Sequence, residues 1–169
     1  MSVLNIQIDD FIGKYSLPSG KFSQEALELA IDKYERIYLI RLFGSKMYNS
    51  FVADLEAFEP QEQAFKDIYE PLEVETKTGI LISDGIRKMV IGFIYWEVCR
   101  KTQTKQTNVG LVAKKGELSE NQDVLNVVDR YNESVWDFLA IQTYIIENKE
   151  LVSEYSEFSG GQIKIEGWF

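Results

Sequence analysis

Histidine is absent from this chain of 169 residues, and cysteine occurs once, at Cys99. Without histidine the commonest general base and the commonest metal ligand are both missing. A Ser-His-Asp or Cys-His catalytic group therefore cannot be built, and neither can the Glu-x-x-His pattern of di-iron bundles. A single cysteine excludes an internal disulfide, so the fold needs no oxidising compartment.

Positive charge is also in short supply. The chain has 27 acidic and 18 basic residues, a formal net charge of −9. Affinity for nucleic acid comes largely from Lys and Arg that neutralise phosphates, so this balance argues against a protein whose main task is to grip nucleic acid. It is compatible with the wall of a channel past which DNA slides without sticking.

Long apolar runs are missing as well. The start, MSVLNIQIDDF, has neither the charged segment nor the continuous apolar run of a signal peptide. The most apolar stretch is residues 89–99, and eleven helical residues at about 1.5 Å each fall well short of a bilayer of roughly 30 Å. We therefore expect no contact with a membrane, and a protein made in the cytoplasm and kept there or carried in a particle assembled there.

The apolar stretch at residues 89–99 is the centre of the predicted fold. Only Gly92 and Glu97 interrupt its apolar residues, which leaves almost no helix face for water. A helix of this kind that is too short for a membrane lies in the middle of a domain. We therefore predict a mainly α fold, a small helical bundle around this central helix, with Ser83 and Asp84 as its caps.

Helical periodicity predicts a long amphipathic segment before the centre. Ser23 offers an N-cap, and apolar residues recur every three or four positions over 27–43. Gly44 can end this helix and Ser45 can cap the next, so the two form a tight pair or a kinked rod. Three carboxylates lie opposite the apolar stripe, where we expect solvent: Glu28, Asp32 and Glu35.

Further elements are predicted on both sides of the central helix. Pro60 and Pro71 bracket a short amphipathic helix at 61–69, and a connector with strand character at 79–82 follows. The longest helix is predicted at about 121–150, where apolar residues again keep the helical spacing.

Extended structure is predicted for three other segments, and together with the helices they form one domain over 1–169. The N-terminal arm, 1–22, alternates apolar and polar residues from Leu4 to Ile8, and it either covers its own core or reaches a neighbour. The loop at 102–119 is longer than compact domains usually leave without structure. Alternation around Val109 and Leu111 favours a β-hairpin or an extended arm there, with a solvated loop as the alternative.

The C-terminal arm, 159–169, combines a glycine hinge with apolar residues. Ile163 and Ile165 alternate with polar residues as in a short strand, and the chain ends on Trp168 and Phe169. An apolar strand after a flexible hinge suits addition to a neighbour's sheet edge or groove. The alternative is that it folds back on its own domain.

Candidate catalytic groups do not form a constellation in this sequence. Asp9 and Asp10 are adjacent and read as turn or cap residues, and Cys99 reads as a core thiol. Glu97 lies in the apolar helix, so we expect it to pair with Arg41 or Arg130, or to lie at a subunit interface. No nucleotide, zinc or calcium motif is present, so the sequence predicts neither an enzyme nor a cofactor.

One run resembles a known family. The residues YLIRLFGSKMYNSF, Tyr38 to Phe51, resemble the signature YL-x-x-L-x-G-x-x-x-Y-x-x-F of head–tail connector proteins of tailed bacteriophages, most nearly the forms carried by crAss-like phages of gut Bacteroidetes. The features that follow also resemble that family in their order, over roughly residues 35–135. They are the aromatic cluster Phe93, Tyr95 and Trp96, then T-x-x-G at Thr107 to Gly110, then Glu120-Asn121 and Tyr131-Asn132.

The resemblance implies a structural virion protein at the head–tail interface. Such adaptor or head-completion proteins are small and helical, and form a ring, usually of twelve copies, between the portal protein and the tail. It implies a homo-oligomer that contacts the portal and other tail or ring proteins, while DNA passes through the channel without specific binding. The residues it implies for subunit, portal or tail contacts are Thr104, Lys105, Thr107, Asn108, Val109, Gly110, Ile163, Ile165, Trp168 and Phe169.

Two other functions stay open on the sequence. The first is a non-enzymatic helical adaptor or regulatory protein that binds a single cellular partner through its C-terminal tail. The second is an enzyme that uses carboxylates and a metal, which the absence of a matching motif disfavours.

Overall fold

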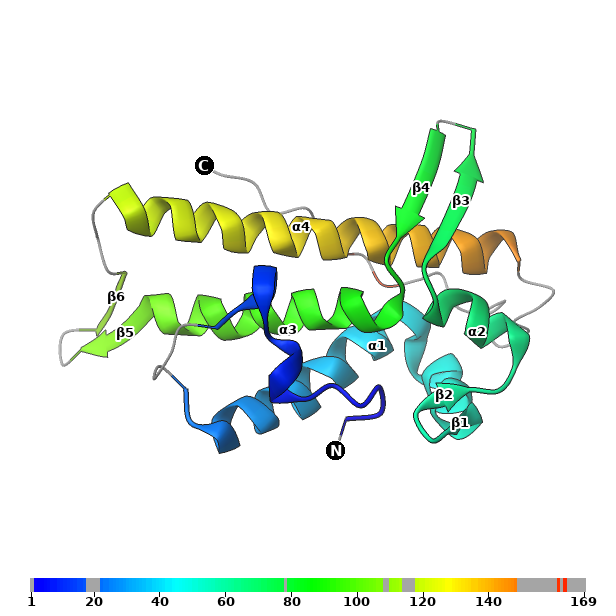
Figure 1. Ribbon diagram of the computed structural model, residues 1–169, viewed down its shortest axis with the longest axis horizontal. Coiled ribbons are helices and arrows are strands. Elements are labelled where there is room, and N and C mark those ends of the chain that lie inside the picture. Colours follow the sequence, from blue (N-terminus) through cyan, green and yellow to red (C-terminus); the bar gives the residue numbers. More distant parts are fainter. Residues whose placement is uncertain are drawn as a thin grey trace.

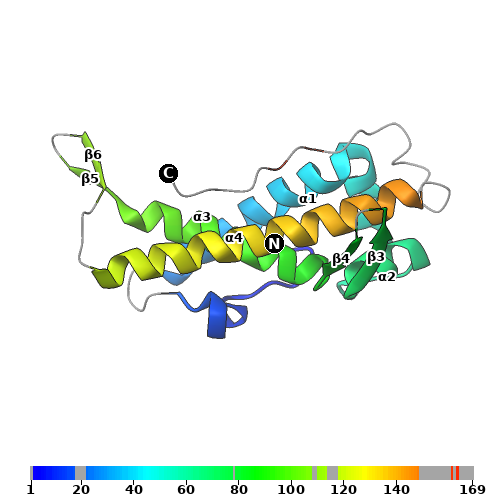
Figure 2. The same ribbon diagram turned by 90° about the horizontal axis from the view of Figure 1, so that it is seen from above.

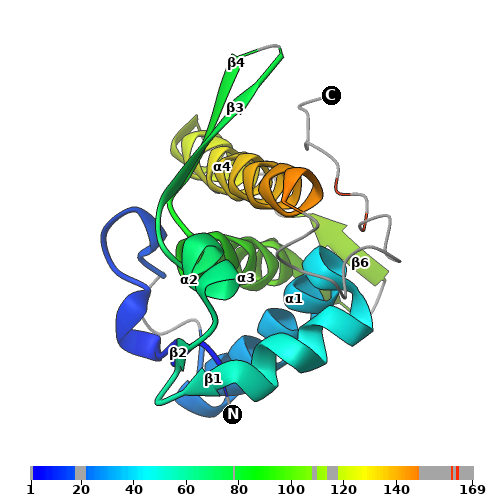
Figure 3. The same cartoon turned by 90° about the vertical axis from the view of Figure 1, so that its right-hand side faces the viewer.

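The computed structural model describes residues 2–17, 22–77, 79–107, 110–113 and 118–148, with Gly161 and Ile163, and describes the backbone alone for those between 102 and 125. Within these residues three long helices run side by side: α1 (Gln24–Asp54), α3 (Ile86–Gln103) and α4 (Leu118–Glu147). Helix α3 lies between the other two (Figures 1 and 3). The predicted fold class, mainly α around a central apolar helix, is confirmed.

Short elements complete the described part of the chain. The helix α2 (Gln63–Tyr69) packs at one end of the bundle, and two 3-10 turns, η1 (Ile8–Asp10) and η2 (Gly13–Tyr15), lie in the N-terminal arm. Three antiparallel hairpins pair β1 (Leu55–Glu56) with β2 (Glu59–Pro60), β3 (Leu72–Thr76) with β4 (Gly79–Ser83), and β5 (Thr104–Thr107) with β6 (Gly110–Ala113). The β5–β6 hairpin and α2 lie at opposite ends of the molecule (Figure 2).

Helix α3 is buried as its sequence predicts. Phe93 is completely buried at the point where the three long helices meet. Its ring stacks on Tyr38 of α1 with centroids 4.1 Å apart, and meets Tyr131 and Phe138 of α4 edge-on. These aromatic contacts join α1 and α4 through α3.

Helices α3 and α4 approach each other closely at Gly92. A Cβ atom at this position would overlap the Oγ of Ser134, which is itself buried and donates to the carbonyl of Arg130 at 3.1 Å. Glycine is therefore required here by packing, because the residue lies within a regular helix and needs no unusual backbone angles.

The start of α3 corrects the sequence prediction. Ser83 pairs with Leu72 as the last residue of β4, and its Oγ accepts from the N–H of Gly85 at 3.1 Å. Gly85 has φ of 91°, and a Cβ there would come within 2.5 Å of the carbonyl of Tyr69. The turn from strand to helix therefore lies at Gly85, and the helix begins at Ile86 rather than directly after Ser83 and Asp84.

Helix α1 is a kinked rod, one of the two forms that the sequence allows. Ser23 is its N-cap as predicted, since its Oγ accepts from the N–H of Ala26 at 3.2 Å. Gly44 has φ of 74° and ψ of 165°, which interrupts the helix. The family-like residues lie around this kink, where Tyr38, Leu39, Leu42 and Phe51 are buried.

The described residues of the N-terminal arm cover the core of their own chain. This is the first of the two alternatives that the sequence left open for the arm. Leu4, Ile6, Phe11 and Tyr15 are buried in the same core as the helices. Glu35 holds the start of the arm, because its carboxylate accepts from the Oγ of Ser2 and the N–H groups of residues 3 and 4 at 2.8–3.0 Å.

Glu35 therefore corrects the expectation of a solvated carboxylate. Its exposed fraction is 2%. Burial raises the pKa of its carboxyl group, and the hydrogen bonds from Leu4, Ser2 and Val3 lower it in part. Glu35 accepts hydrogen bonds from the backbone of the arm, and the spacing of apolar residues in α1 does not reveal this role.

The remaining elements are close to their predicted bounds. Helix α2 begins two residues inside the predicted segment and buries Ala64, Phe65 and Ile68. The predicted strand at 79–82 lies in β4, but its partner β3 was predicted only as a connector. Helix α4 begins three residues before the predicted 121 and ends at Glu147.

Candidate assembly surfaces

The β5–β6 hairpin carries four of the residues implied by the family resemblance. Thr104, Lys105 and Thr107 lie in β5 and Gly110 lies in β6. The backbone pairs Thr107 with Gly110, so the predicted β-hairpin or extended arm is a hairpin. Asn108 and Val109 lie outside the described residues.

The C-terminal arm is described at two positions only. Ile163 is half-buried against the core of its own chain, which is the fold-back alternative at this residue. Ile165, Trp168 and Phe169 lie outside the described residues. The structure therefore places Gly161 and Ile163, at the base of the arm, on their own domain.

The base of the arm is held at the kink of α1. Gly161 donates its N–H to the carbonyl of Arg41 at 3.2 Å, and its own carbonyl accepts from the Nε2 of Gln142 at 3.3 Å. The carbonyls in the last turn before a helix break lack partners from their own helix. The kink at Gly44 thus offers the acceptor that binds the arm.

Glycine is required at 161 by the same contact. A Cβ atom there would lie 2.5 Å from the carbonyl oxygen of Arg41 and 2.7 Å from its Cγ. An open groove continues from this point along α1, lined by Ile37, Ile40, Arg41, Gly44, Ser45 and Gly161. Gly161 is therefore a contact position as well as part of the predicted hinge.

The β3–β4 hairpin presents a surface that sequence reasoning missed. Its register places Glu73 opposite Ile82 and Glu75 opposite Ile80, so these four side chains share one face. Ile80 and Ile82 are 60% and 61% exposed, and both glutamates are exposed. We call these four residues the hairpin face.

The opposite face of the same hairpin packs on α4. Val74 and Ser83 on that face are buried, and the hairpin rises beyond α4 in the view of Figure 1. The apolar run Ile80, Leu81, Ile82 does not by itself reveal which face is covered. The signal that could have found the hairpin is the alternation of Leu72-Glu73-Val74-Glu75, which is typical of a half-buried strand.

Asp137 joins the hairpin to α4. Its Oδ1 accepts from the N–H of Asp84 at 2.9 Å. Burial raises the pKa of Asp137 to about 6, the nearby charge of Asp84 adds to this rise, and the hydrogen bonds from Asp84 N–H and Ser83 oppose it. This carboxyl group stabilises the position of a strand end, and no reactive group lies beside it in the contacts described.

Glu97 has partners other than those expected. It accepts from the hydroxyl of Tyr38 at 3.1 Å and from Arg100 at 2.9 Å. Arg130 pairs with Glu133, while the guanidinium of Arg41 lies over the ring of Tyr38 at 5.2 Å. Arg100 is one turn away on the same helix, so its pairing with Glu97 needs no second element.

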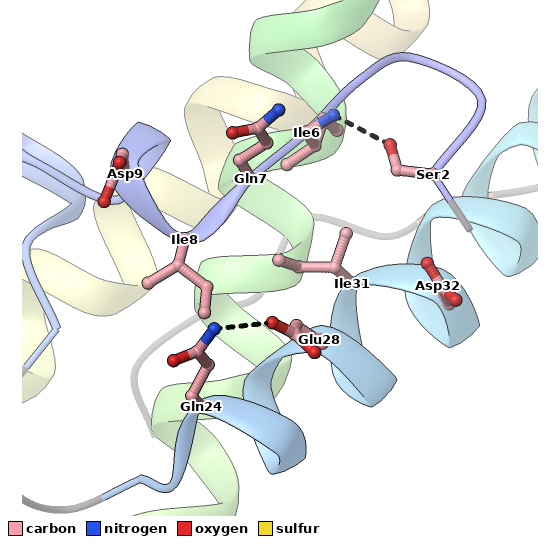
Figure 4. Close-up of a pocket in the computed structure, with 9 residues that line it drawn as sticks. All are labelled: Ser2, Ile6, Gln7, Ile8, Asp9, Gln24, Glu28, Ile31 and Asp32. Atoms are coloured by element: carbon pink, nitrogen blue, oxygen red, sulfur yellow. Dashed lines mark hydrogen bonds between the residues drawn. The ribbon is translucent and has the colours of Figure 1, made fainter.

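A second hollow lies between the N-terminal arm and the start of α1. Figure 4 shows three carboxylates along its rim, from Asp9, Glu28 and Asp32, at separate places rather than around one point. Gln24 donates to Glu28 at 2.9 Å. Among the side chains that the structure describes, no group of three His, Cys, Asp or Glu residues gathers to hold a metal ion.

In the described part of the chain, every helix is too short or too polar to span a bilayer. Comparisons with protein-family models, with curated proteins and with solved structures found no match for this chain. The structure defines the class of the protein as a small, mainly helical protein with projecting hairpins. The likeness to head–tail connectors rests on the residues quoted from the sequence.

Proposed function

We propose that this chain is a structural virion protein that forms an oligomeric ring between the capsid portal and the tail and lines the DNA channel. One observation supports it above the others. The family-like signature coincides with a structural feature, because its glycine, Gly44, is the kink of α1. Around that kink Tyr38, Leu39, Leu42 and Phe51 are buried and Tyr48 is half-buried. The signature therefore consists of residues that build the fold around this kink.

Two further properties agree with this proposal. The net charge of −9 suits a channel wall that must not hold DNA. The hairpin face leaves two isoleucines in water on an element that projects from the body. A ring needs such a surface, since each copy must contact the next.

The mass of the assembled protein tests this function. We expect the purified chain, alone or with the portal protein, to form a species near twelve times the 19.5 kDa of one copy. Mass photometry over a range of concentrations and electron micrographs of the same sample measure it. A protein that remains a monomer or dimer in both conditions would contradict the ring and support the second candidate, an adaptor with a single cellular partner.

A further inference from the structure

The exposed side of α1 carries a second apolar surface, with two basic residues between its apolar side chains. Leu29 is 65% exposed and Ile37 is 39% exposed, and exposed Lys33 and Arg36 lie between them. Their spacing places all four on one side of the helix. We call these four residues the α1 stripe.

The stripe lies opposite the buried side of α1. The buried residues Ile31, Tyr34 and Tyr38 face the core, half a turn away from the stripe. The acidic residues Glu28 and Asp32 lie on the shoulder towards the N-terminal arm, where they line the hollow in Figure 4. The basic residues of this part of α1 therefore lie among its exposed apolar side chains.

The hairpin face and the α1 stripe belong to opposite sides of the molecule. The β3–β4 hairpin rises beyond α4, and α1 lies on the other side of α3 (Figures 1 and 3). One copy therefore cannot bring them together. A contact between two different surfaces of neighbouring copies repeats from copy to copy, and it closes into a ring when the rotation allows.

We propose that the hairpin face of one copy docks on the α1 stripe of the next, and this inference rests on the proposed function. Two isoleucines flanked by two glutamates meet a leucine and an isoleucine flanked by a lysine and an arginine, so the apolar and the charged parts both match. Complementary charge of this kind favours one partner and one register over others.

The same charges act against the simplest competing contact. Two hairpin faces packed on each other would bring four carboxylates together, and like charges directly opposite are destabilising. Two α1 stripes would likewise bring four cations together. Contact between the hairpin face and the α1 stripe avoids both of these repulsions, and such a contact between unlike surfaces favours a ring over a two-fold dimer.

Charge reversal on each surface tests this contact. One variant carries Glu73→Lys and Glu75→Lys, and the other carries Lys33→Glu and Arg36→Glu. Each variant alone should form at least about tenfold less ring than the unchanged protein, because like charges then face each other across the contact. Mixed in equal amounts, the two variants should recover the ring, since the reversed hairpin of one then fits the reversed stripe of the other.

The β1–β2 hairpin supplies a matched control. Glu56 and Glu59 are exposed and lie directly opposite each other. The double substitution Glu56→Lys with Glu59→Lys therefore makes the same change of net charge as the hairpin variant, at a different place on the surface. This control should form rings as the unchanged protein does. Circular dichroism and thermal unfolding of every variant identify any loss of ring that comes from misfolding, and recovery in the mixture is a result that misfolded chains cannot produce.

The possible results separate this contact from the function on which it rests. If the unchanged protein forms rings and the reversed variants do so equally well, the contact is overturned and the ring stands. The contact is also overturned if the hairpin variant keeps the ring but loses the portal or tail. If the unchanged protein never exceeds a dimer, alone or with its portal, both proposals fail.

Discussion

Helix α3 and the β3–β4 hairpin are neighbours in the sequence and both are rich in isoleucine, yet they differ in what covers them. Ile94 of α3 is completely buried, whereas Ile82 of the hairpin is 61% exposed. Helix α3 has α1 on one side and α4 on the other, while the hairpin has a neighbour on one face only. Apolar content therefore does not decide burial here, and the number of covering elements does.

The difference implies two kinds of response to mutation. Substitutions in α3 should change the free energy of unfolding and affect assembly only through it. Substitutions on the hairpin face should leave folding intact and change assembly alone.

The largest effect is expected for Phe93→Ala, which tests whether α3 is the buried centre of the fold. It removes a ring that contacts α1 and α4 at once, so we expect a loss of about 3–5 kcal/mol in the free energy of unfolding. Urea denaturation followed by circular dichroism measures it. Trp136→Ala, at a side chain 51% exposed on α4, is the control and should cost far less. Equal losses would contradict the central role of α3.

Asp137→Asn tests the junction between the hairpin and α4. The pKa of Asp137 is raised to about 6 from 3.8, so between these values the folded chain binds more protons than the unfolded chain. The stabilisation present below pH 4 is therefore lost as the pH rises to about 6, by roughly 3 kcal/mol at most.

The asparagine variant should lack this part of the pH dependence. Glu35 also has a raised pKa and contributes in the same direction, so the difference between the two proteins is the informative quantity. Denaturation from pH 4 to 7 measures it, together with NMR titration of the Asp137 carboxyl carbon. Identical slopes for the two proteins, or a midpoint near 4, would show that the carboxyl group is not buried at the junction.

Gly92→Val tests the close packing between α3 and α4. The added side chain meets Ser134 where the two helices approach closely, and overpacking of this kind costs about 1–3 kcal/mol. Thermal unfolding measures the loss. Adding Ser134→Ala should recover part of it, and no recovery would mean that the strain lies elsewhere.

The smallest change in stability is expected on the hairpin face. Ile82→Thr should alter the free energy of unfolding by less than about 0.5 kcal/mol, since its side chain is already mostly in water. Val74→Thr, on the covered face of the same hairpin, places a hydroxyl among buried apolar atoms and should cost more, about 1–3 kcal/mol. If the two substitutions have equal effects on urea denaturation, the two faces are not different.

Much of the helical fold could be predicted from the sequence, because it depends on signals that lie close together along the chain. The cap at Ser23, the break at Gly44 and the apolar run at 89–99 each act within a few residues. The hairpin face could not be predicted in the same way, because it combines two strands whose register no single segment contains. The contacts expected of Ile163 and the residues after it stay a prediction.

The sequence by itself determined which segments are helical, where α1 breaks, and that no histidine-based chemistry is possible. Tertiary structure decided that Glu35 is buried under the N-terminal arm, that the hydroxyl of Tyr38 donates to Glu97, and which side of Ile80 to Ile82 meets solvent. The physical reason is distance along the chain. Caps and periodicity act over one or two turns, but the covering of a charge or a strand face depends on residues dozens of positions away, which only the folded chain brings into contact.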